Sequence, residues 1–366
     1  MRRFRPTVVG VDLDAIRHNV GVLKPDRAEL MAVLKADAYG HGVVPVARAV
    51  LQAGATWLGV ALVEEGIGLR DAGVDAPILV LSEFPPGAEK DALEAGLTPS
   101  LYGHDGLRAL ADAAGGREVG VHVKVDTGMH RVGVWPPDAA PSFCLDVVHA
   151  GLRVDGLWTH FAASESDADG TREQLQRFRQ ALEGVRETGV VPRWTHTANS
   201  AATLLYPETH LDIVRPGAAV FGIDPGVGIG PRAGLRPSLT WRSSVAFVRR
   251  LPAGERLSYG WRYRLERDAN VATIPVGYED GYRRGLSSKA DVLIRGRRYR
   301  VAGTITMDQL LVDCGDDEVS AGDEVVLIGA QGDDRITAEE LAGHLGTIGY
   351  EIVTAISERV PREFVG

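Results

Sequence analysis

The chain has 366 residues, which corresponds to about two domains at the usual allowance of 100–200 residues each. Hydrophobic residues make up 45% and charged residues 24%, an ordinary globular composition that excludes wholesale disorder, collagen and coiled coil. Lys and Arg number 40 against 49 Asp and Glu, a net charge of −9. This acidic balance disfavours non-specific binding to nucleic acid or to an anionic membrane.

Apolar segments and cysteines narrow the class further. No apolar run reaches the length of a membrane span, and the N-terminal Met-Arg-Arg-Phe-Arg leads into no apolar signal segment, so we expect a cytoplasmic protein. Cys144 and Cys314 are the only cysteines and show neither Cys-x-x-Cys nor zinc-ligand spacing. We therefore expect no disulfide framework and no metal site.

Short β-branched runs alternate with amphipathic stretches from about residue 28 to 215. This alternation predicts eight strands, at 30–35, 56–60, 77–81, 96–100, 118–125, 152–158, 193–197 and 211–214. Helical patterns lie between them at 43–53, 105–114, 138–150 and 171–187. Eight such units are what a (β/α)8 TIM barrel requires. The fourth strand has the weakest pattern, and a doubly wound parallel sheet remains the alternative.

The pattern changes after about residue 234, where helical periodicity fades. Short strands are predicted at 240–250, 271–276, 291–295, 297–302, 309–313 and 323–328, with one helix near 337–345. We therefore predict an α/β protein with a barrel domain at 1–233 and a mostly β domain at 234–366.

Lys35 lies at the carboxyl end of the first predicted strand, where barrels carry their active sites. A lone strand-end lysine is usually solvated, but this apolar strand delivers Lys35 inward. Desolvation there would lower the pKa of the amine and make it a usable nucleophile.

Other polar residues follow later strands at the same end of the barrel. They are Lys124, Asp126 and Arg131 with strand five, His160 after strand six, Asn199 and Ser200 after strand seven, and Arg215 after strand eight. Each has a structural interpretation alone, such as a surface arginine, a core histidine or a helix N-cap, but their convergence favours a site.

A phosphate site is the next prediction, because barrels frequently bind phosphate with the loops after strands seven and eight. Asn199, Ser200, Gly217 and Gly222 suit that role. A lysine amine facing a phosphate cradle predicts pyridoxal phosphate held as a Schiff base.

The ordered motifs of the chain resemble those of bacterial alanine racemases over residues 8–364. These motifs are AVLKADAYGHG, KVDTGMHRVG, THFA, HTANSAA, VRPG, LSYGWRY, PVGYEDGYRR, TMDQ and IGYEIVTAISERVPREF. The resemblance implies a pyridoxal-phosphate-dependent homodimer with an N-terminal barrel and a C-terminal β domain.

The resemblance also implies roles for individual residues. Lys35 would carry the cofactor and act as one acid/base, while Tyr259 from the partner subunit would be the other. The cofactor would be held further by Tyr39, His160, Asn199, Ser200, Arg215, Gly217 and Tyr350. The substrate alanine would contact Arg131, and Met307 and Asp308 would complete its pocket from the second subunit. Lys124 resembles a lysine that is carbamylated in many members, and Tyr278 would line the entrance.

The implied activity is interconversion of L- and D-alanine, supplying D-alanine for peptidoglycan. Four positions depart from the commoner pattern and leave the strictness for alanine open, namely Glu165, Phe221, Glu279 and Thr306. Three alternatives are a barrel decarboxylase, a D-amino-acid dehydratase or aldolase, and a non-catalytic pyridoxal-phosphate carrier. Arg215 argues against the decarboxylase, and the lack of a metal-ligand pattern argues against the dehydratase or aldolase. The second domain with Tyr259 argues against the carrier.

Overall fold

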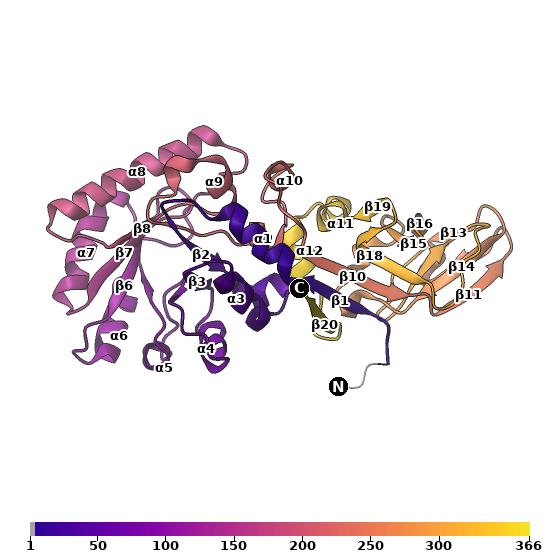
Figure 1. Cartoon of the computed structure of the whole chain (residues 1–366), viewed down its shortest axis with the longest axis horizontal. Coiled ribbons are helices and arrows are strands. Elements are labelled where there is room, and N and C mark those ends of the chain that lie inside the picture. The colour runs from indigo at the N-terminus through magenta and orange to yellow at the C-terminus, as the bar shows by residue number, and fades with distance from the viewer. Residues whose placement is uncertain (1–3) are drawn as a thin grey trace. The chain divides into compact units, whose positions relative to one another are not determined.

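The structure is a computed structural model that describes residues 4–366, and it divides into two compact units (Figure 1). One unit comprises residues 15–38 and 42–236, and the other comprises residues 4–14, 39–41 and 237–366. Within the described residues, no helix combines the length and the apolar character that crossing a bilayer requires.

The first unit contains eight parallel strands with helices between them (Figure 1). The strands pair in two sets of four, in the orders β4-β3-β2-β9 and β5-β6-β7-β8. Their bounds are β2 (Glu29–Val33), β3 (Trp57–Val60), β4 (Ile78–Val80), β5 (Ser100–Leu101), β6 (Gly120–Lys124), β7 (Arg153–Trp158), β8 (Trp194–His196) and β9 (Ile213–Val214).

The two sets of strands join into a closed barrel. A parallel bridge between Leu79 and Thr98 links β4 to the segment before β5, and the Asp212 N–H donates to the Thr195 carbonyl between β8 and β9. Because β9 also pairs with β2, the first and last strands are neighbours. An open doubly wound sheet would leave both as edges, so the (β/α)8 prediction is confirmed.

All eight predicted strands of the barrel are present, and the weakest prediction, 96–100, corresponds to the two-residue strand β5. The helices of this region are α1 (Leu13–Leu23), α2 (Lys35–Gly40), α3 (Val43–Gln52), α4 (Val63–Asp71), α5 (Glu89–Glu94), α6 (His104–Ala114), α7 (Ala140–His149), α8 (Ala168–Glu187), α9 (Ser200–Leu205) and α10 (Ile229–Arg232). Helix α8 begins before the predicted Thr171 because the Asp167 side chain caps it, accepting from the Gly170 N–H at 2.9 Å.

Apolar side chains from neighbouring strands fill the barrel. Met31, Leu79 and Ile213 are fully buried together, and Trp57 and Trp194 pack against them. These residues come from five different strands, as expected for the layered interior of a TIM barrel. The packed interior leaves the carboxyl ends of the strands as the place for polar side chains.

The second unit is mostly β, as predicted, and is built on a ten-stranded sheet. The strands run in the order β11-β14-β17-β16-β15-β18-β10-β1-β20, with β19 beside β18, and β12 and β13 form a separate pair. The bounds are β1 (Val8–Asp12), β10 (Leu239–Ser244), β11 (Phe247–Leu251), β12 (Arg256–Leu257), β13 (Tyr263–Arg264), β14 (Ala269–Ile274), β15 (Asp291–Ile294), β16 (Arg297–Val301), β17 (Leu310–Asp313), β18 (Glu324–Gln331), β19 (Asp334–Ile336) and β20 (Arg362–Val365). Its helices are α11 (Ala338–Leu345) and α12 (Gly349–Thr354).

Two features of this sheet differ from the sequence-based expectation. The predicted single strand at 240–250 is wrong, because the chain leaves one set of partners at Val245 and Ala246: β10 pairs with β1 and β18, whereas β11 pairs with β14. Strands β1, β19 and β20 of the sheet were not predicted. Strand β1 pairs antiparallel with β10 and parallel with β20, so its partners are remote in sequence.

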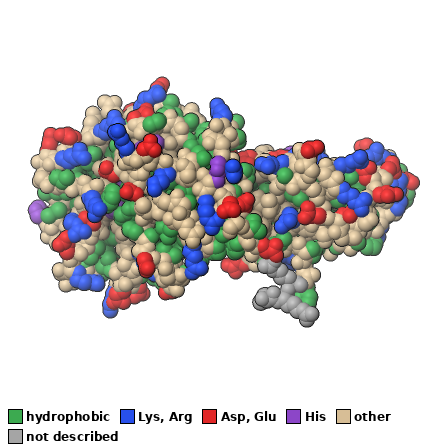
Figure 2. Space-filling model, in the orientation of Figure 1, with side chains coloured by type: hydrophobic (Ala, Val, Ile, Leu, Met, Phe, Trp, Pro, Cys, Tyr) green, Lys and Arg blue, Asp and Glu red, His purple; other side chains and the backbone are tan. Residues whose placement is uncertain are grey.

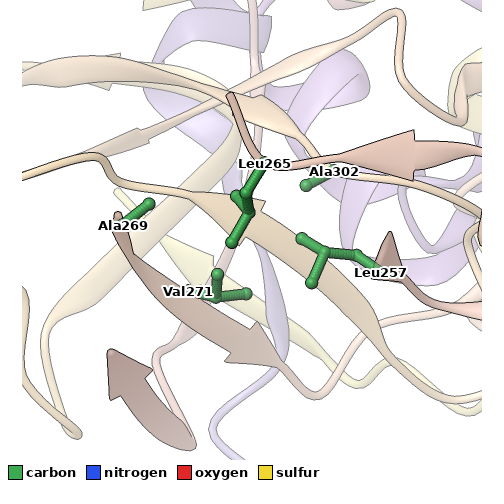
Figure 3. Close-up of a cluster of buried hydrophobic side chains, with 5 residues drawn as sticks. All are labelled: Leu257, Leu265, Ala269, Val271 and Ala302. Carbon is green, nitrogen blue, oxygen red and sulfur yellow. The ribbon is translucent and has the colours of Figure 1, made fainter. Parts of the chain in front are cut away.

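A small apolar cluster anchors two loops of the second unit (Figure 3). Leu257, Leu265, Ala269, Val271 and Ala302 are all buried in it. Leu257 lies two residues before Tyr259, a predicted site residue, and Ala302 immediately precedes the loop at 303–309. Packing of this cluster therefore fixes the base of both loops.

Acidic and basic side chains are interspersed over the face drawn in Figure 2. Many form local ion pairs, such as Arg298 with Asp334 at 2.8 Å and Arg250 with Asp316 at 2.6 Å. Exposed pairs of this kind contribute little stability, so burial of apolar residues is the main stabilising contribution.

Candidate active site

The predicted barrel residues lie at the carboxyl ends of the strands, which share one end of a parallel barrel. Lys35 follows β2, Lys124 ends β6, His160 follows β7, Ser200 follows β8 and Arg215 follows β9. The barrel therefore brings residues that are far apart in sequence to one mouth.

The backbone after Lys35 is left-handed. Residues 36–39 have φ angles between 51° and 54°, and none of them is glycine. An L-residue in this conformation costs about 1–2 kcal/mol, and such strain persists only where surrounding contacts hold it. Helix α2 is therefore a strained turn at the mouth, which its residue types did not predict.

The Lys35 amine has an altered affinity for protons. Burial lowers its pKa, and Arg131 lowers the pKa further, whereas Glu65 raises it. A lowered pKa increases the fraction of neutral amine, which is the nucleophilic and proton-accepting form.

Lys124 is more strongly perturbed. Its side chain is 4% exposed, and Nζ lies 4.4 Å from the centre of the Trp158 ring. Burial, followed by the charges of Arg131 and Arg215, lowers the pKa of the amine to about 7, although Asp126 opposes the shift. At neutral pH this lysine is therefore only partly protonated.

Asp126 organises the loop that leads to Arg131. Its Oδ1 accepts from the backbone N–H groups of Gly128, Met129 and His130 at 2.9, 3.0 and 3.1 Å. Arg131 itself is exposed at the end of this turn. Asp126 thus has a role in shaping the loop rather than only adding charge to the mouth.

Arg215 is a buried cation with neutral partners. Its Nη2 donates to the Thr159 carbonyl at 2.6 Å and approaches His160 Nδ1 at 3.5 Å, and its Nη1 contacts His196 Nδ1 at 2.9 Å. Burial lowers the pKa of the guanidinium to about 9. Among residues 4–366, its hydrogen-bond acceptors are carbonyl and imidazole groups, so its charge is directed at the barrel mouth without a carboxylate to neutralise it.

Two buried histidines extend this contact into the barrel, and sequence reasoning missed both. Because arginine only donates, His196 Nδ1 accepts and its Nε2–H donates to His122 Nδ1 at 2.9 Å. His122 must then carry its own proton on Nε2, an atom with no hydrogen-bond partner among the described residues. Burial lowers the pKa of His122 to about 4 and the pKa of His196 well below its usual value, so both rings are neutral. The available signal was the position of each histidine in an apolar strand.

Ser200 stands beside two backbone amides. Its Oγ accepts from the Gly217 N–H at 2.9 Å and from the Ala219 N–H at 3.3 Å. Asn199 caps α9 instead, because its Oδ1 accepts from the Ala202 N–H at 3.0 Å. A hydroxyl and clustered backbone N–H groups suit a phosphate, so this part of the mouth fits an anionic group.

Tyr39 and Tyr350, both predicted to bind the cofactor, belong to the second unit and meet within it. Their rings lie edge to face with centroids 6.2 Å apart. Burial raises the pKa of the Tyr39 hydroxyl, which therefore keeps its proton and remains a hydrogen-bond donor.

Three loops of the second unit gather the remaining predicted residues. The exposed fractions of Tyr259, Tyr278 and Met307 are 73%, 36% and 50%. The Thr304 hydroxyl donates to the Tyr259 carbonyl at 2.8 Å, and the Tyr278 N–H donates to the Thr306 carbonyl at 3.0 Å. These side chains therefore lie on associated loops and extend from the surface of the chain.

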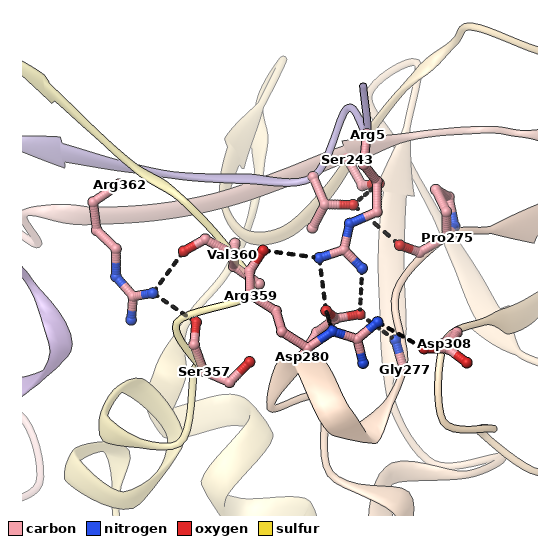
Figure 4. Close-up of polar contacts among 11 residues, drawn as sticks. Arg5, Ser243, Pro275, Gly277, Asp280, Asp308, Ser357, Arg359, Val360 and Arg362 are labelled. Carbon is pink, nitrogen blue, oxygen red and sulfur yellow. Dashed lines mark hydrogen bonds and ion pairs between the residues drawn. The ribbon is translucent and has the colours of Figure 1, made fainter. Parts of the chain in front are cut away.

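Asp280 is the buried centre of an ion-pair network beneath those loops (Figure 4). Its carboxylate accepts from Arg5 at 2.7 and 3.0 Å and from the Gly277 N–H at 3.0 Å. Arg359 lies 3.7 Å from Asp280 and 2.7 Å from Asp308. The network orients Asp308, a predicted substrate residue, through Arg359.

The four departures from the commoner pattern have ordinary environments. Glu165 and Glu279 are exposed, and Phe221 is buried. The Thr306 hydroxyl donates to the Gln309 carbonyl at 2.8 Å within its own turn.

A closed barrel whose mouth carries a buried lysine, a buried arginine and a cluster of amide donors defines a (β/α)8-barrel enzyme acting at its strand ends. Residues 11–225 match the family model "Alanine racemase, N-terminal domain", and residues 238–364 match "Alanine racemase, C-terminal domain". The chain belongs to the alanine racemase family, and the prediction of an amino-acid racemase, an isomerase, is confirmed.

Individual relatives agree over the full length. The chain is 48% identical to alanine racemase of Symbiobacterium thermophilum, covering 99% of this chain and 98% of the relative. It is 44% identical to that of Frankia casuarinae, covering 97% and 95%. The crystal structure of alanine racemase from D-cycloserine-producing Streptomyces lavendulae superposes with a TM-score of 0.95 at 41% identity, covering 100% of this chain and 98% of that one. The crystal structure of alanine racemase from Bacillus anthracis with bound L-Ala-P superposes with a TM-score of 0.94 at 38% identity, covering 100% of this chain and 96% of that one.

Proposed function

We propose that this protein interconverts L-alanine and D-alanine with pyridoxal phosphate as cofactor. The observation that carries the proposal is the half-buried Lys35 amine with its lowered pKa, at a barrel mouth that also contains the buried, unneutralised Arg215. A nucleophilic amine is the group that a cofactor aldehyde requires.

The donor set of the mouth suits this cofactor. Lys35 would hold the aldehyde end, while the Ser200 hydroxyl and the Gly217 N–H would hold the phosphate. Arg215 would face the pyridine nitrogen with His160 beside it. Asn199, Tyr39 and Tyr350 would complete the set. When bound, pyridoxal phosphate supplies an electron sink for charge at the α-carbon of the amino acid.

Two acid/base groups on opposite sides of the substrate carry out the proposed proton transfers. Lys35 Nζ removes the α-proton of D-alanine, and Tyr259 Oη removes that of L-alanine; each returns a proton in the reverse direction. Arg131 would bind the substrate carboxylate, while Met307 and Asp308 of the second subunit would complete the pocket. Tyr278 would line the entrance.

Arg215 would limit a side reaction. Arg215 offers only N–H donors, so it would leave a pyridine nitrogen that accepts from it without a proton. The weaker electron withdrawal that results would favour return of the proton to the α-carbon over transamination.

A homodimer with shared sites follows from the exposure of Tyr259. At 73% exposed, its hydroxyl lacks the water-excluded setting that proton transfer to carbon favours. We therefore place it in the site of a second copy of the chain. We further propose a boundary near residue 233 between a cofactor-binding barrel domain, 1–233, and a domain, 234–366, that supplies this base, and a cytoplasmic role in providing D-alanine for peptidoglycan.

The test is incubation of the purified protein, loaded with pyridoxal phosphate, with pure L-alanine, followed by chiral chromatography. Formation of D-alanine up to an equal mixture is expected. Release of CO2 as the main change would contradict the proposal and favour the decarboxylase. No reaction with alanine would also contradict the proposal, and would favour the dehydratase, aldolase or carrier alternatives, since alanine has no β-hydroxyl group that a dehydratase could eliminate. Borohydride reduction before proteolysis should label Lys35, and a label on another lysine would refute its assignment.

A complementation experiment tests the shared site. Lys35→Ala and Tyr259→Phe chains are each expected to be inactive as homodimers. Mixed dimers should regain activity at one of their two sites. Isolated heterodimers without activity would contradict the contribution of Tyr259 from the partner.

A further inference from the structure

The left-handed turn after Lys35 needs something to hold it. Four consecutive non-glycine residues, 36–39, have positive φ, a conformation that L-residues leave unless their surroundings prevent it. Any relaxation of this backbone would move Lys35, which immediately precedes it.

Glu65 contacts the first residue of that turn. Its Oε1 accepts from the Ala36 N–H at 2.6 Å. Its Oε2 accepts from the N–H groups of Ala61 at 2.8 Å and Leu62 at 3.2 Å, at the start of α4. The carboxylate therefore joins the end of β2 to the end of the neighbouring strand β3.

The two oxygens of Glu65 have separate partners, and all of these partners are donors. An amide at this position would replace one oxygen with an NH2 group, which cannot accept. Either the Ala36 contact or the α4 contacts would then be lost. A carboxylate accepts from the Ala36 N–H and from the N–H groups at the start of α4 at the same time. Glu65 therefore does more than cap α4.

We propose that Glu65 is a positioning residue for Lys35: its carboxylate clamps the Ala36 N–H and so keeps the left-handed turn that aims Lys35 Nζ at the substrate. The inference rests on the proposed racemase activity for its catalytic consequence, although the clamp itself is a property of the cofactor-free chain. Asp37 holds the other end of the turn, because its Oδ1 accepts from the Val43 N–H at 2.7 Å.

The charge of Glu65 has an effect separate from its geometry. It raises the pKa of Lys35 against the lowering by burial and by Arg131. The charge of Lys35 in turn lowers the pKa of Lys124, so the two amines are electrostatically coupled. Glu65 thus supplies the negative charge that offsets part of this cationic surrounding.

The first experiment uses cofactor-free protein and is independent of activity. Glu65→Gln is compared with Glu64→Gln, an exposed neighbour in the same first turn of α4, by hydrogen exchange and mass spectrometry. Exchange in a peptide spanning residues 34–42 should rise about tenfold in Glu65→Gln alone. Adding Ala36→Gly, which takes positive φ without strain, should restore part of the protection. Unchanged exchange in this peptide, or an equal rise in every barrel peptide, would overturn the clamp.

The second experiment measures its catalytic consequence in the loaded enzyme. A displacement of about 1 Å can cost about a hundredfold in rate, so kcat should fall between tenfold and a hundredfold in Glu65→Gln with KM changed less than about threefold. The primary deuterium isotope effect should rise with D-alanine, whose proton goes to Lys35, more than with L-alanine. Equal effects for the two enantiomers, or the same loss in Glu64→Gln, would overturn the positioning role. Failure of the wild-type protein to racemise would refute the proposed function, and the exchange result would then stand separately.

Discussion

Replacing Lys124 with methionine should stabilise the protein. The amine is buried over Trp158, and burial together with Arg131 and Arg215 lowers its pKa to about 7 from a usual 10.5. A group that binds its proton less tightly in the folded state than in the unfolded state opposes folding wherever the unfolded chain is protonated. The destabilisation is therefore complete below about pH 7 and disappears as the pH rises toward 10.5.

The magnitude follows from the difference in pKa. Each pKa unit corresponds to about 1.4 kcal/mol, so Lys124 lowers the free energy of unfolding by about 4 kcal/mol at pH 7 and about 2 kcal/mol at pH 9. Loss of the cation–π contact with Trp158 offsets about 1 kcal/mol. Lys124→Met should then raise the free energy of unfolding by about 3 kcal/mol at pH 7 and about 1 kcal/mol at pH 9.

Urea unfolding of cofactor-free protein, followed by circular dichroism in CO2-free buffer, measures this difference. Lys90→Met is the matched control, because Lys90 is an exposed lysine of α5 in the same unit, with a side chain 74% exposed. It should change the free energy of unfolding by less than about 0.5 kcal/mol. A Lys124→Met gain that is absent at pH 7, or as large at pH 9 as at pH 7, would refute the argument from desolvation.

Four further predictions concern residues of the barrel unit and of the C-terminal unit. Bicarbonate should carbamylate the neutral Lys124 amine of the wild type and give a carbamate signal by 13C NMR with labelled bicarbonate; a signal that survives in Lys124→Met would assign it elsewhere. Asp280→Ala should lower the free energy of unfolding by about 2–3 kcal/mol, because it removes charge-assisted hydrogen bonds; a loss below about 0.5 kcal/mol would show that the network adds little. Tyr259→Phe in deuterium oxide should still exchange the α-proton of D-alanine but not that of L-alanine, and equal exchange would favour a single mobile base. 15N NMR should find His122 and His196 neutral with the proton on Nε2 from pH 5.5 to 8. Protonation of either ring in that range would contradict the hydrogen bonds assigned from Arg215 to His196 and from His196 to His122.

Local patterns in the sequence were sufficient for the strands of the barrel. All eight strands were predicted because an apolar, β-branched run between helical patterns depends on neighbours along the chain. The position of Lys35, His160 and Arg215 at one mouth followed as well, since parallel strands place their carboxyl ends together. The C-terminal strands were predicted less well, and 240–250 was wrongly joined, because only pairing with different partners separates β10 from β11.

Contacts between distant residues decided the rest. Strand β1 exists because β10 and β20 lie on either side of it, and no local pattern contains those partners. The left-handed turn after Lys35 contradicts the preferences of its own residues and depends on surrounding contacts, of which Glu65 supplies one at 2.6 Å. The tautomers of His196 and His122 depend on Arg215 as a donor. A sequence specifies which groups are present, but strain, tautomer and pKa depend on what surrounds each group, and only the packed structure determines those surroundings.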